Sequence, residues 1–323
     1  MEIHSTTKLT FSGYLLALEG GGTRSQAALM DAAGRLLQIS DASEVNTNFV
    51  SFEQAQQAVL SAVRGVLQSA GVGGEAVGLV ASALVGAHFG PETLGALLPE
   101  AVFRHYSERD VIFARAGIYH PHGIAVVAAT GATAFGVRLD DGREVLMGGW
   151  GALLGDEGSA YALGLLGLRI AARAYEGRQP ASTRLMEAVC QHFGLHEANF
   201  RQELIALAYQ KPLSRAEIAG LAAGVTRLAG EGDRAAAHLT AKVAGDLAAL
   251  GLHACRRLFE EYETFDLVIG GGLANAGYVI LAPLQQGLAQ EFPHASFMIG
   301  KEQPAAALGR LALHNLLDEN PNP

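Results

Sequence analysis

Two glycine-rich segments carry the residue types that bind phosphate groups. The first is Gly20-Gly21-Gly22-Thr23, and the second is Thr130-Gly131-Ala132-Thr133. Glycine lets the backbone approach a phosphate closely, because a Cβ atom would collide with it, and successive N–H groups can then point at the anion. Thr23 and Thr133 add hydroxyl donors. One such turn alone is more often an ordinary tight hairpin, so the presence of two is the stronger signal.

A third glycine run, Gly270-Gly271-Gly272, follows an apolar segment and precedes a predicted helix. Bare backbone at this point could lie against a flat base or a ribose. The alternative is a strand-to-helix turn that packs closely.

Two acidic residues stand near these loops. Glu19 lies at the tip of the strand that enters the first loop, where its carboxylate could hold Mg²⁺, directly or through water, beside phosphates. The alternative for Glu19 is a carboxylate that caps backbone N–H groups. Asp156 lies in the glycine-rich segment 148–158, which could close over a ligand, although Asp156 could also be a helix cap.

The segments that contain the first two loops share one plan. Leu15–Leu37 and Ile124–Leu146 each consist of a strand, a glycine loop, a second strand, an Asp/Gly turn and a third strand. A repeat of this kind indicates two similar lobes, each with a glycine hairpin. Two hairpins that face one cleft could hold a polyphosphate from both sides.

Strands and helices alternate along the rest of the chain, which indicates mixed α/β sheets covered by helices. Capping-box patterns at Ser51 and Ser214 predict the starts of two helices. The other elements predicted are strands at 77–85, 111–114 and 265–269 and helices at 234–262 and 304–317. We expect a disordered lead-in at 1–13, an N-terminal domain at 14–120, and a C-terminal domain at 121–323 that includes the closing helix.

The composition excludes some classes of protein. The chain has 323 residues, half of them apolar, and a formal net charge of -9. These values suit two well-buried domains, and the acidic balance argues against a nucleic-acid surface. The first ten residues do not resemble a signal peptide, and no apolar stretch is long enough to span a membrane. We therefore expect a cytoplasmic protein in which Cys190 and Cys255 are reduced core thiols.

The segment Gly148–Tyr161, GGWGALLGDEGSAY, strongly resembles the N-acetylglucosamine kinases among the BadF/BadG/BcrA/BcrD-type ATPases of the actin–hexokinase–Hsp70 superfamily. Residues 19–23 resemble the phosphate loop of that family, Asp-Gly-Gly-Gly-Thr. Gly270–Leu273 resembles its adenosine loop, and Gln303–Leu313 resembles its closing Ala-Leu-Gly helix. The resemblance covers almost the whole chain from Tyr14 onward.

The resemblance implies an α/β fold of two actin-like (ribonuclease H-like) domains around an ATP cleft. It also implies ATP with Mg²⁺ as cofactors and phosphoryl transfer to the hydroxyl of a small-molecule sugar. The sugar contacts would be Asp156, Ala160 in the same motif, and Asn48, which matches the Asn of a Ser-Thr-Asn-like loop. An ordinary polar turn is the alternative for Asn48. A homodimer is common among relatives.

Two residues depart from the family pattern. Glu19 stands where the family has Asp, so its longer side chain would displace a metal ion or its water. The family's general base, an Asp at the end of a strand, aligns with Ala114. Asp110 would lie about 13 Å away at the rise of a strand. Loss of a general base commonly costs about 10²–10⁴ in rate, so we expect a slow amino-sugar kinase; the alternative is a non-catalytic sensor that binds ATP and sugar.

Two groups of histidines are further candidates for metal binding or for acid–base chemistry. The segment Cys190–Glu197 contains Cys, His and Glu side chains that could bind a metal ion, but a surface helix end is the favoured interpretation. His120 and His122 could replace the missing base, although we favour a role for them in the hinge between the domains.

Overall fold

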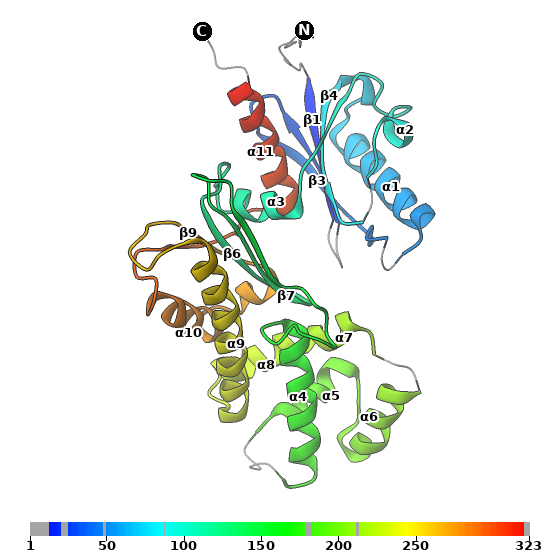
Figure 1. Ribbon diagram of the computed structural model, residues 1–323. Coiled ribbons are helices and arrows are strands. Elements are labelled where there is room, and N and C mark those ends of the chain that lie inside the picture. Colours follow the sequence, from blue (N-terminus) through cyan, green and yellow to red (C-terminus); the bar gives the residue numbers. More distant parts are fainter. Residues whose placement is uncertain are drawn as a thin grey trace. The chain divides into compact units, whose positions relative to one another are not determined.

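The computed structural model describes residues 13–20, 25–47, 50–86, 88–178, 183–210 and 213–319. The chain forms two compact units (Figure 1). The first comprises Met1–His120 and Gly300–Pro323, and the second comprises Pro121–Ile299.

A five-stranded sheet in the order β3-β2-β1-β4-β5 forms the centre of the first unit. Its strands are β1 (Tyr14–Gly20), β2 (Ser25–Asp31), β3 (Leu36–Ala42), β4 (Val77–Leu84) and β5 (Val102–His105). Strands β1 to β3 form an antiparallel meander, whereas β4 and β5 run parallel to β1. The central part of β1 is a continuous apolar run because helices cover both faces of the sheet.

Helix α1 (Phe52–Ala70) covers one face of this sheet. It begins with the predicted capping box, in which Ser51 Oγ accepts a hydrogen bond from the backbone N–H of Gln54. Helix α11 (Pro304–Glu319) covers the other face, together with α3 (Glu108–Ala114), while α2 (Pro91–Leu94) is a single turn. Both helices were predicted from the sequence, α1 from its capping box at Ser51 and α11 as the closing helix at 304–317.

Two predictions for the first unit are wrong. The closing helix α11 does not belong to the C-terminal domain, because its apolar side packs on the first sheet, with Ala305 and Leu308 against Leu15 and Ala17. The segment 111–114 is not a strand but the end of α3, which begins with a capping box at Ser107. A short apolar run fits a buried strand or a buried helix equally well, so this run alone could not decide between them.

The second unit repeats the sheet of the first. Its order is β10-β9-β6-β7-β8, with the same strand directions, so β6 matches β1 and the β6–β7 hairpin matches the β1–β2 hairpin. The strands are β6 (Gly123–Ala128), β7 (Ala132–Val137), β8 (Glu144–Gly148), β9 (Asp266–Gly270) and β10 (Ser296–Ile299). The predicted repeat of two similar lobes is therefore confirmed.

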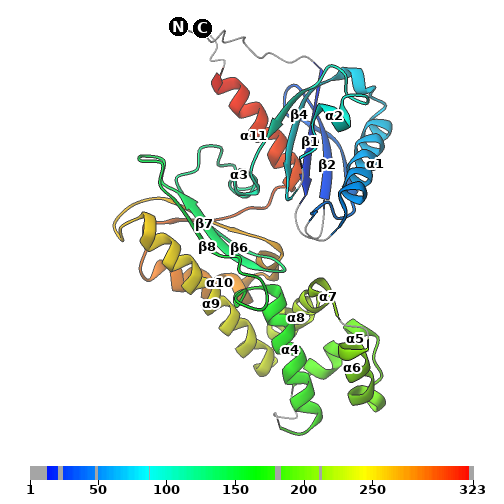
Figure 2. The ribbon, with the colours of Figure 1, turned by 45° about the vertical axis from the view of Figure 1, so that its right-hand side comes forward.

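Helices cover this sheet and extend beyond it (Figure 2). Helix α9 (Arg234–Leu258) packs on β6, β7 and β8 and against α10 (Tyr278–Ala289). A group of helices beside α9 consists of α4 (Ala160–Tyr175), α5 (Leu185–Phe193), α6 (Phe200–Tyr209), α7 (Arg215–Gly220) and α8 (Ala222–Gly230). The described residues also form 3₁₀ turns at Gly74–Ala76, Glu197–Asn199 and Gly272–Ala276. Cys190 and Cys255 are free and buried, and no helix within the described ranges is long and apolar enough to cross a bilayer.

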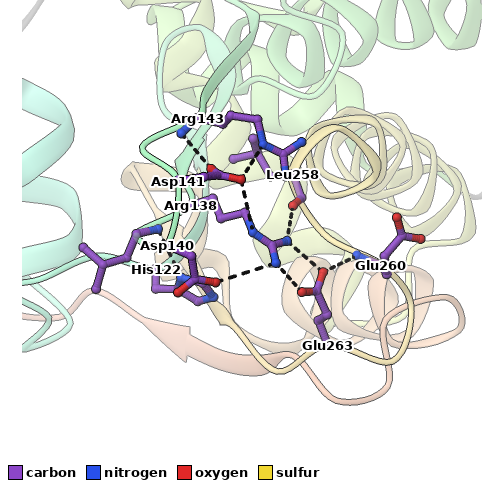
Figure 3. Close-up of polar contacts among 9 residues, drawn as sticks. His122, Arg138, Asp140, Asp141, Arg143, Leu258, Glu260 and Glu263 are labelled. Carbon is purple, nitrogen blue, oxygen red and sulfur yellow. Dashed lines mark hydrogen bonds and ion pairs between the residues drawn. The ribbon is translucent and has the colours of Figure 1, made fainter.

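A charged network joins the end of β7 to the segment after α9 (Figure 3). Arg138 donates hydrogen bonds to both carboxylate oxygens of Glu263, at 2.9 and 2.5 Å, and these bonds lower the pKa of Glu263 to about 2. The guanidinium lies 5.5 Å from the centre of the Phe259 ring. His122 Nδ1 accepts a hydrogen bond from the backbone N–H of Leu139, and its ring meets Phe259 edge-on. His122 therefore has a structural role in this network.

The contact of α11 with the first sheet yields a test of the domain assignment. A Cβ atom on Gly309 would lie 2.3 Å from Met30 Sδ and 3.0 Å from Leu15 Cδ2. We therefore expect Gly309→Ala to lower the free energy of unfolding by about 1–3 kcal/mol because of overpacking. Gly245→Ala, at an exposed position of α9, is the matched control: no described atom lies within 4 Å of its Cβ position. It should gain roughly 0.5–1 kcal/mol from helix propensity. Urea denaturation measures the free energy of unfolding of both variants. An equal increase in both would contradict the close packing of α11 on the first sheet.

Candidate active site

Glu19 lies at the end of β1 on the sheet face that α3 and α11 cover. Side chains alternate along a strand, so Glu19 follows Leu15 and Ala17 on this face. A Cβ atom on the next residue, Gly20, would lie 2.4 Å from Val45 Cγ2, so only glycine fits where the chain leaves the strand. The predicted phosphate-binding residues Gly21, Gly22 and Thr23 lie outside the described residues.

Two further ionisable side chains act on Glu19. Glu108 is the first residue of α3 and Arg115 is its C-cap, two helical turns later on the same side of the helix. Burial and, second, the negative charge of Glu108 raise the pKa of Glu19 to about 7, while the charge of Arg115 opposes the shift. Partial loss of solvent also raises the pKa of Glu108, although its side chain stays exposed. The carboxyl end of the first sheet thus holds two carboxylates and one guanidinium.

The sequence analysis missed Glu108 and Arg115. The available signal was the capping box at Ser107, which marks a helix start directly after a strand and so places Glu108 at the carboxyl end of β5. Arg115 is held by a hydrogen bond from its Nε to Glu302 O at 2.8 Å. Burial lowers the pKa of Arg115, whereas the charge of Glu19 raises it.

Ala114, the expected position of the general base, lies at the other end of α3. It is fully buried and packs in one cluster with Ala307 and Leu311 of α11. Glu108 lies six residues earlier, roughly 9 Å along the helix axis, at the exposed start of α3. Asp110 is occupied in the capping box and accepts a hydrogen bond from the backbone N–H of Ser107 at 2.9 Å.

A second polar group lies at the same carboxyl end of the sheet, on the face toward α1. Ser82 on β4 and His105 on β5 are register partners, and Ser82 Oγ lies 2.6 Å from His105 Nδ1. The ring of His88 meets the ring of His105 edge-on, with centroids 5.1 Å apart. These two histidines and the serine were not singled out from the sequence.

The loop expected to contact a sugar lies against the turn that follows β4. The hydroxyl of Thr47 donates a hydrogen bond to Gly86 O, and a Cβ atom on Gly86 would lie 3.2 Å from Asn46 Oδ1. Asn48 itself lies outside the described residues. The structure therefore places the neighbours of Asn48 near the end of β4 but leaves its predicted role as an expectation.

Asp156 in the second unit is a strained and buried residue. Its φ of 67° is the one positive value among the described non-glycine residues, a conformation that costs of order 1–3 kcal/mol. Its carboxylate accepts hydrogen bonds from the backbone N–H of Ala132 at 3.1 Å and from Arg215 Nη2 at 2.7 Å. Helix α4 begins at Ala160 and is capped by Ser159. The alternative interpretation of Asp156 as a helix cap is therefore wrong.

The second glycine hairpin rests on the start of α4. The backbone N–H of Ala160 donates to Ala129 O at 2.9 Å, and that of Tyr161 points at Thr130 O at 3.4 Å. A Cβ atom on Gly131 would lie 2.9 Å from a carboxylate oxygen of Asp156, so glycine is required here. The hairpin, the segment with Asp156 and α4 thus form one connected structure.

The remaining predicted residues of the second unit have different surroundings. The hydroxyl of Thr133 donates to Met147 O at 3.0 Å, so its proton points at β8. Gly270 ends β9, and Gly271 has a φ of 86° and would bring a Cβ within 2.3 Å of Ala128 O. A Cβ on Gly272 would meet no described atom within 4 Å. The third glycine run therefore combines a close turn with an open backbone surface.

The structure also shows the contacts of the histidines considered as metal ligands, in Cys190–Glu197, or as a substitute base, at His120. His192 Nε2 lies 2.9 Å from Glu217 O, and His196 pairs with Glu203, so the segment Cys190–Glu197 does not converge on a metal site. His120 lies in the first unit, where it contacts Asp318.

Two sheets of the same connectivity, each with a hairpin between its first two strands, form the two units of an actin-like fold. The chain belongs to the BadF/BadG/BcrA/BcrD ATPase family, whose model matches residues 18–309.

Curated relatives and solved structures agree with this assignment. An N-acetylmuramic acid/N-acetylglucosamine kinase of Clostridium acetobutylicum is 29% identical over 131 residues, which is 41% of each chain. An N-acetyl-D-glucosamine kinase of Dictyostelium discoideum is 27% identical over 195 residues, or 60% of each chain. Both alignments span less than two thirds of the relatives.

The solved structures match over nearly the whole chain. A Chromobacterium violaceum protein assigned as an N-acetylglucosamine kinase has a TM-score of 0.67 at 24% identity and covers 94% of this chain and 99% of its own. A ROK family glucokinase of Streptomyces griseus, solved with glucose and AMPPNP, has a TM-score of 0.59 at 18% identity and covers 93% and 98%. At these identities, the likeness establishes the fold.

The raised pKa of Glu19 predicts a pH dependence of stability. The carboxyl group has a pKa of about 7 in the folded chain against an ordinary value of 4.5, so the folded state binds its proton more tightly. Stability must then fall as pH rises from about 4.5 to about 7. We expect Glu19→Gln to raise the free energy of unfolding at pH 8 by on the order of 2–3 kcal/mol and to change it little at pH 4.5. Urea denaturation across this range, with exposed Glu100→Gln as control, checks this; parallel profiles for both variants would refute it.

The contacts of Asp156 predict a structural as well as a ligand-binding effect. Asp156→Asn weakens two hydrogen bonds to a buried carboxylate, so we expect a loss of about 1–3 kcal/mol in the stability of the second unit. Arg215→Gln removes only one of these bonds and should destabilise less. Differential scanning calorimetry measures both effects, and titration with N-acetylglucosamine tests the sugar contact. If affinity is unchanged in both variants while the transition temperature falls, Asp156 only supports the hairpin.

Proposed function

We propose that the chain is an ATP-dependent kinase of an amino sugar of the N-acetylglucosamine type, with Glu108 as its general base. The observation that carries the proposal is the pair of carboxylates, Glu19 and Glu108, at the carboxyl end of the first sheet. The family assignment and the two curated kinases support the same reaction class.

The chemistry assigned to Glu108 follows from its position and its pKa. A general base works best when its pKa lies near the operating pH, and loss of solvent moves the pKa of Glu108 upward from its ordinary value. Glu108 would accept the proton of the sugar hydroxyl as its oxygen bonds to the γ-phosphorus of ATP. The bond between that phosphorus and the bridging oxygen then breaks and ADP leaves. An exposed side chain at a helix start can reach such a hydroxyl, whereas position 114 is closed by α11.

The residues around Glu19 fit a phosphate group with its metal ion. Gly20 leaves no room for a side chain, and Ser25 Oγ is buried without a hydrogen-bond partner among the described residues. Glu19 would hold Mg²⁺ directly or through water, and Mg²⁺ when bound neutralises phosphate charge. That positive charge would favour the ionised form of Glu19 and so oppose the burial that raises the pKa of Glu19 to about 7.

The second unit supplies backbone surfaces that suit a nucleotide. The open backbone at Gly272 would accommodate the flat face of a base or ribose, and the Thr130–Gly131 turn would face phosphate oxygens. Asp156 is the candidate sugar contact, with one carboxylate oxygen held by Ala132 and the other by Arg215.

The expectation of a slow enzyme depended on the missing carboxylate at Ala114. With Glu108 as the base that reason disappears, and so does the main argument for a non-catalytic sensor. We therefore propose a kinase with ordinary turnover.

A kinetic comparison tests the proposal. Glu108→Gln should lower kcat by about 10²–10⁴ and leave ATP affinity nearly unchanged, because the proton acceptor is lost but no phosphate contact is removed. Asp110→Asn, a variant of the same helix start, is the control and should affect stability more than kcat. ATP consumption is measured with N-acetylglucosamine, N-acetylmuramic acid and glucose.

Ala114→Asp separates the two candidate positions of the base. It would bury a carboxylate between α3 and α11, so it should destabilise the first unit and give no gain in rate. Wild-type kcat in Glu108→Gln, or a faster Ala114→Asp enzyme, would overturn the assignment of the base. A wild-type protein that consumes no ATP with any of the sugars would overturn the proposed function.

A further inference from the structure

We propose that His120, His314 and Asp318 form a binding site for one divalent transition-metal ion of the zinc class, within the first unit. The proposal does not depend on the kinase reaction, because none of these residues belongs to the candidate active site.

The three side chains converge from two segments of the first unit. His314 and Asp318 are four residues apart on α11 and therefore lie on one side of that helix. His120 is the last residue of the unit before the chain passes to Pro121. His120 Nε2 lies 2.8 Å from Asp318 Oδ2, and His314 Nδ1 lies 3.2 Å from the same oxygen.

These distances are compatible with a shared metal ion as well as with a side-chain ion pair. One ligand atom from each residue lies within 4.8 Å of the other two. Tetrahedral ligand atoms stand about 3.3 Å apart when each bond to zinc is about 2.0 Å, so small shifts would complete the geometry. His314 Nδ1 is shielded from solvent, and its 3.2 Å contact with Asp318 Oδ2 does not have the geometry of a hydrogen bond. A metal ion would give that nitrogen a well-aligned bond.

Neighbouring rings hold the imidazoles in place. Tyr119 packs on the His314 ring with centroids 4.7 Å apart, and His120 meets the same ring edge-on at 5.0 Å. The arginines nearby are paired with other carboxylates, Arg104 with Glu319 and Arg310 with Glu302. Asp318 is therefore left to the two histidines.

The donor set determines the class of ion. Two imidazole nitrogens and one carboxylate oxygen suit Zn²⁺, Ni²⁺, Co²⁺ or Cu²⁺, whereas Mg²⁺ and Ca²⁺ prefer all-oxygen sites. Three protein ligands leave a coordination position for water. An ion here would tie His120, next to one of the two chain connections between the units, to the closing helix α11.

The competing explanation is an ion pair between Asp318 and the two histidines. Such a pair takes up no metal ion, so titration with the ion itself separates the two explanations. Ligand atoms of a metal site must be free of protons, so metal affinity rises with pH. The other ionisable groups near the site, Tyr119, Arg104, Glu319, Arg310 and Glu302, are present equally in every variant below.

Calorimetric titration of the full chain, without a polyhistidine tag, with ZnCl₂ at pH 6, 7 and 8 tests the proposal. We expect one equivalent, tighter binding at higher pH, and a rise in the melting temperature of the wild type. Titration with CoCl₂ should give visible absorption bands of a protein-bound ion. His314→Gln and Asp318→Asn should each weaken binding at least about tenfold.

His294→Gln, an exposed histidine on the second unit, and Cys190→Ser are the control variants and should bind as the wild type does. Metal-free melting temperatures confirm that all variants are folded. No saturable binding, binding unchanged in both triad variants, or affinity that falls with rising pH would each overturn the proposal. Kinase activity with Mg²⁺ is measured separately, so a failed kinase assay does not bear on this site.

Discussion

The candidate site depends on one largely buried carboxylate, that of Glu19 in the first unit. Glu19 is the last side chain of a strand whose earlier residues on the same face are apolar and covered by α11. Burial and the nearby charge of Glu108 make its ionised form unfavourable, and Arg115 compensates only in part. Ionisable groups whose pKa values are strongly shifted by burial and by a neighbouring charge are typical of functional sites. The rest of the first unit can be understood as the frame that keeps these three groups together.

Helix α3 is the part of that frame with the least obvious sequence signal. Its capping box fixes where the helix begins, which places Glu108 at the carboxyl end of β5. Its apolar end packs on α11, and α11 in turn lies close to the sheet because Gly309 has no side chain. The position of the proposed base thus depends on a residue about two hundred positions later in the chain. A substitution in α11 can affect the site without contact with substrate.

The second unit supports its hairpin with a different set of charges. The hairpin matches that of the first sheet in topology, but it is held by the buried carboxylate of Asp156, a residue with left-handed backbone, which accepts a hydrogen bond from the backbone N–H of Ala132. Arg215, brought in by the helices inserted between β8 and β9, pairs with that carboxylate. The repeat therefore preserves the strands and the hairpin but not the charges that support them.

The sequence was informative wherever the physical cause was local. The glycine hairpins, the two capping boxes at Ser51 and Ser214 and the alternation of strands and helices could all be predicted, because each depends on neighbouring residues. Two features depended on contacts that no local pattern encodes. An amphipathic helix such as α11 could pack on either sheet, and its place in the first unit depends on contacts with β1, β2 and β4 that lie far away in the sequence. The run Val111–Ala114 is apolar because α11 buries it, not because it is a strand, and this misinterpretation hid Glu108. The aligned position of the base, Ala114, and the proposed base, Glu108, are less than two turns apart on one helix. When a family's catalytic residue is absent at its aligned position, the start of the nearest helix after a parallel strand is therefore a place to search, because ligands of open α/β sheets bind at the carboxyl ends of the strands.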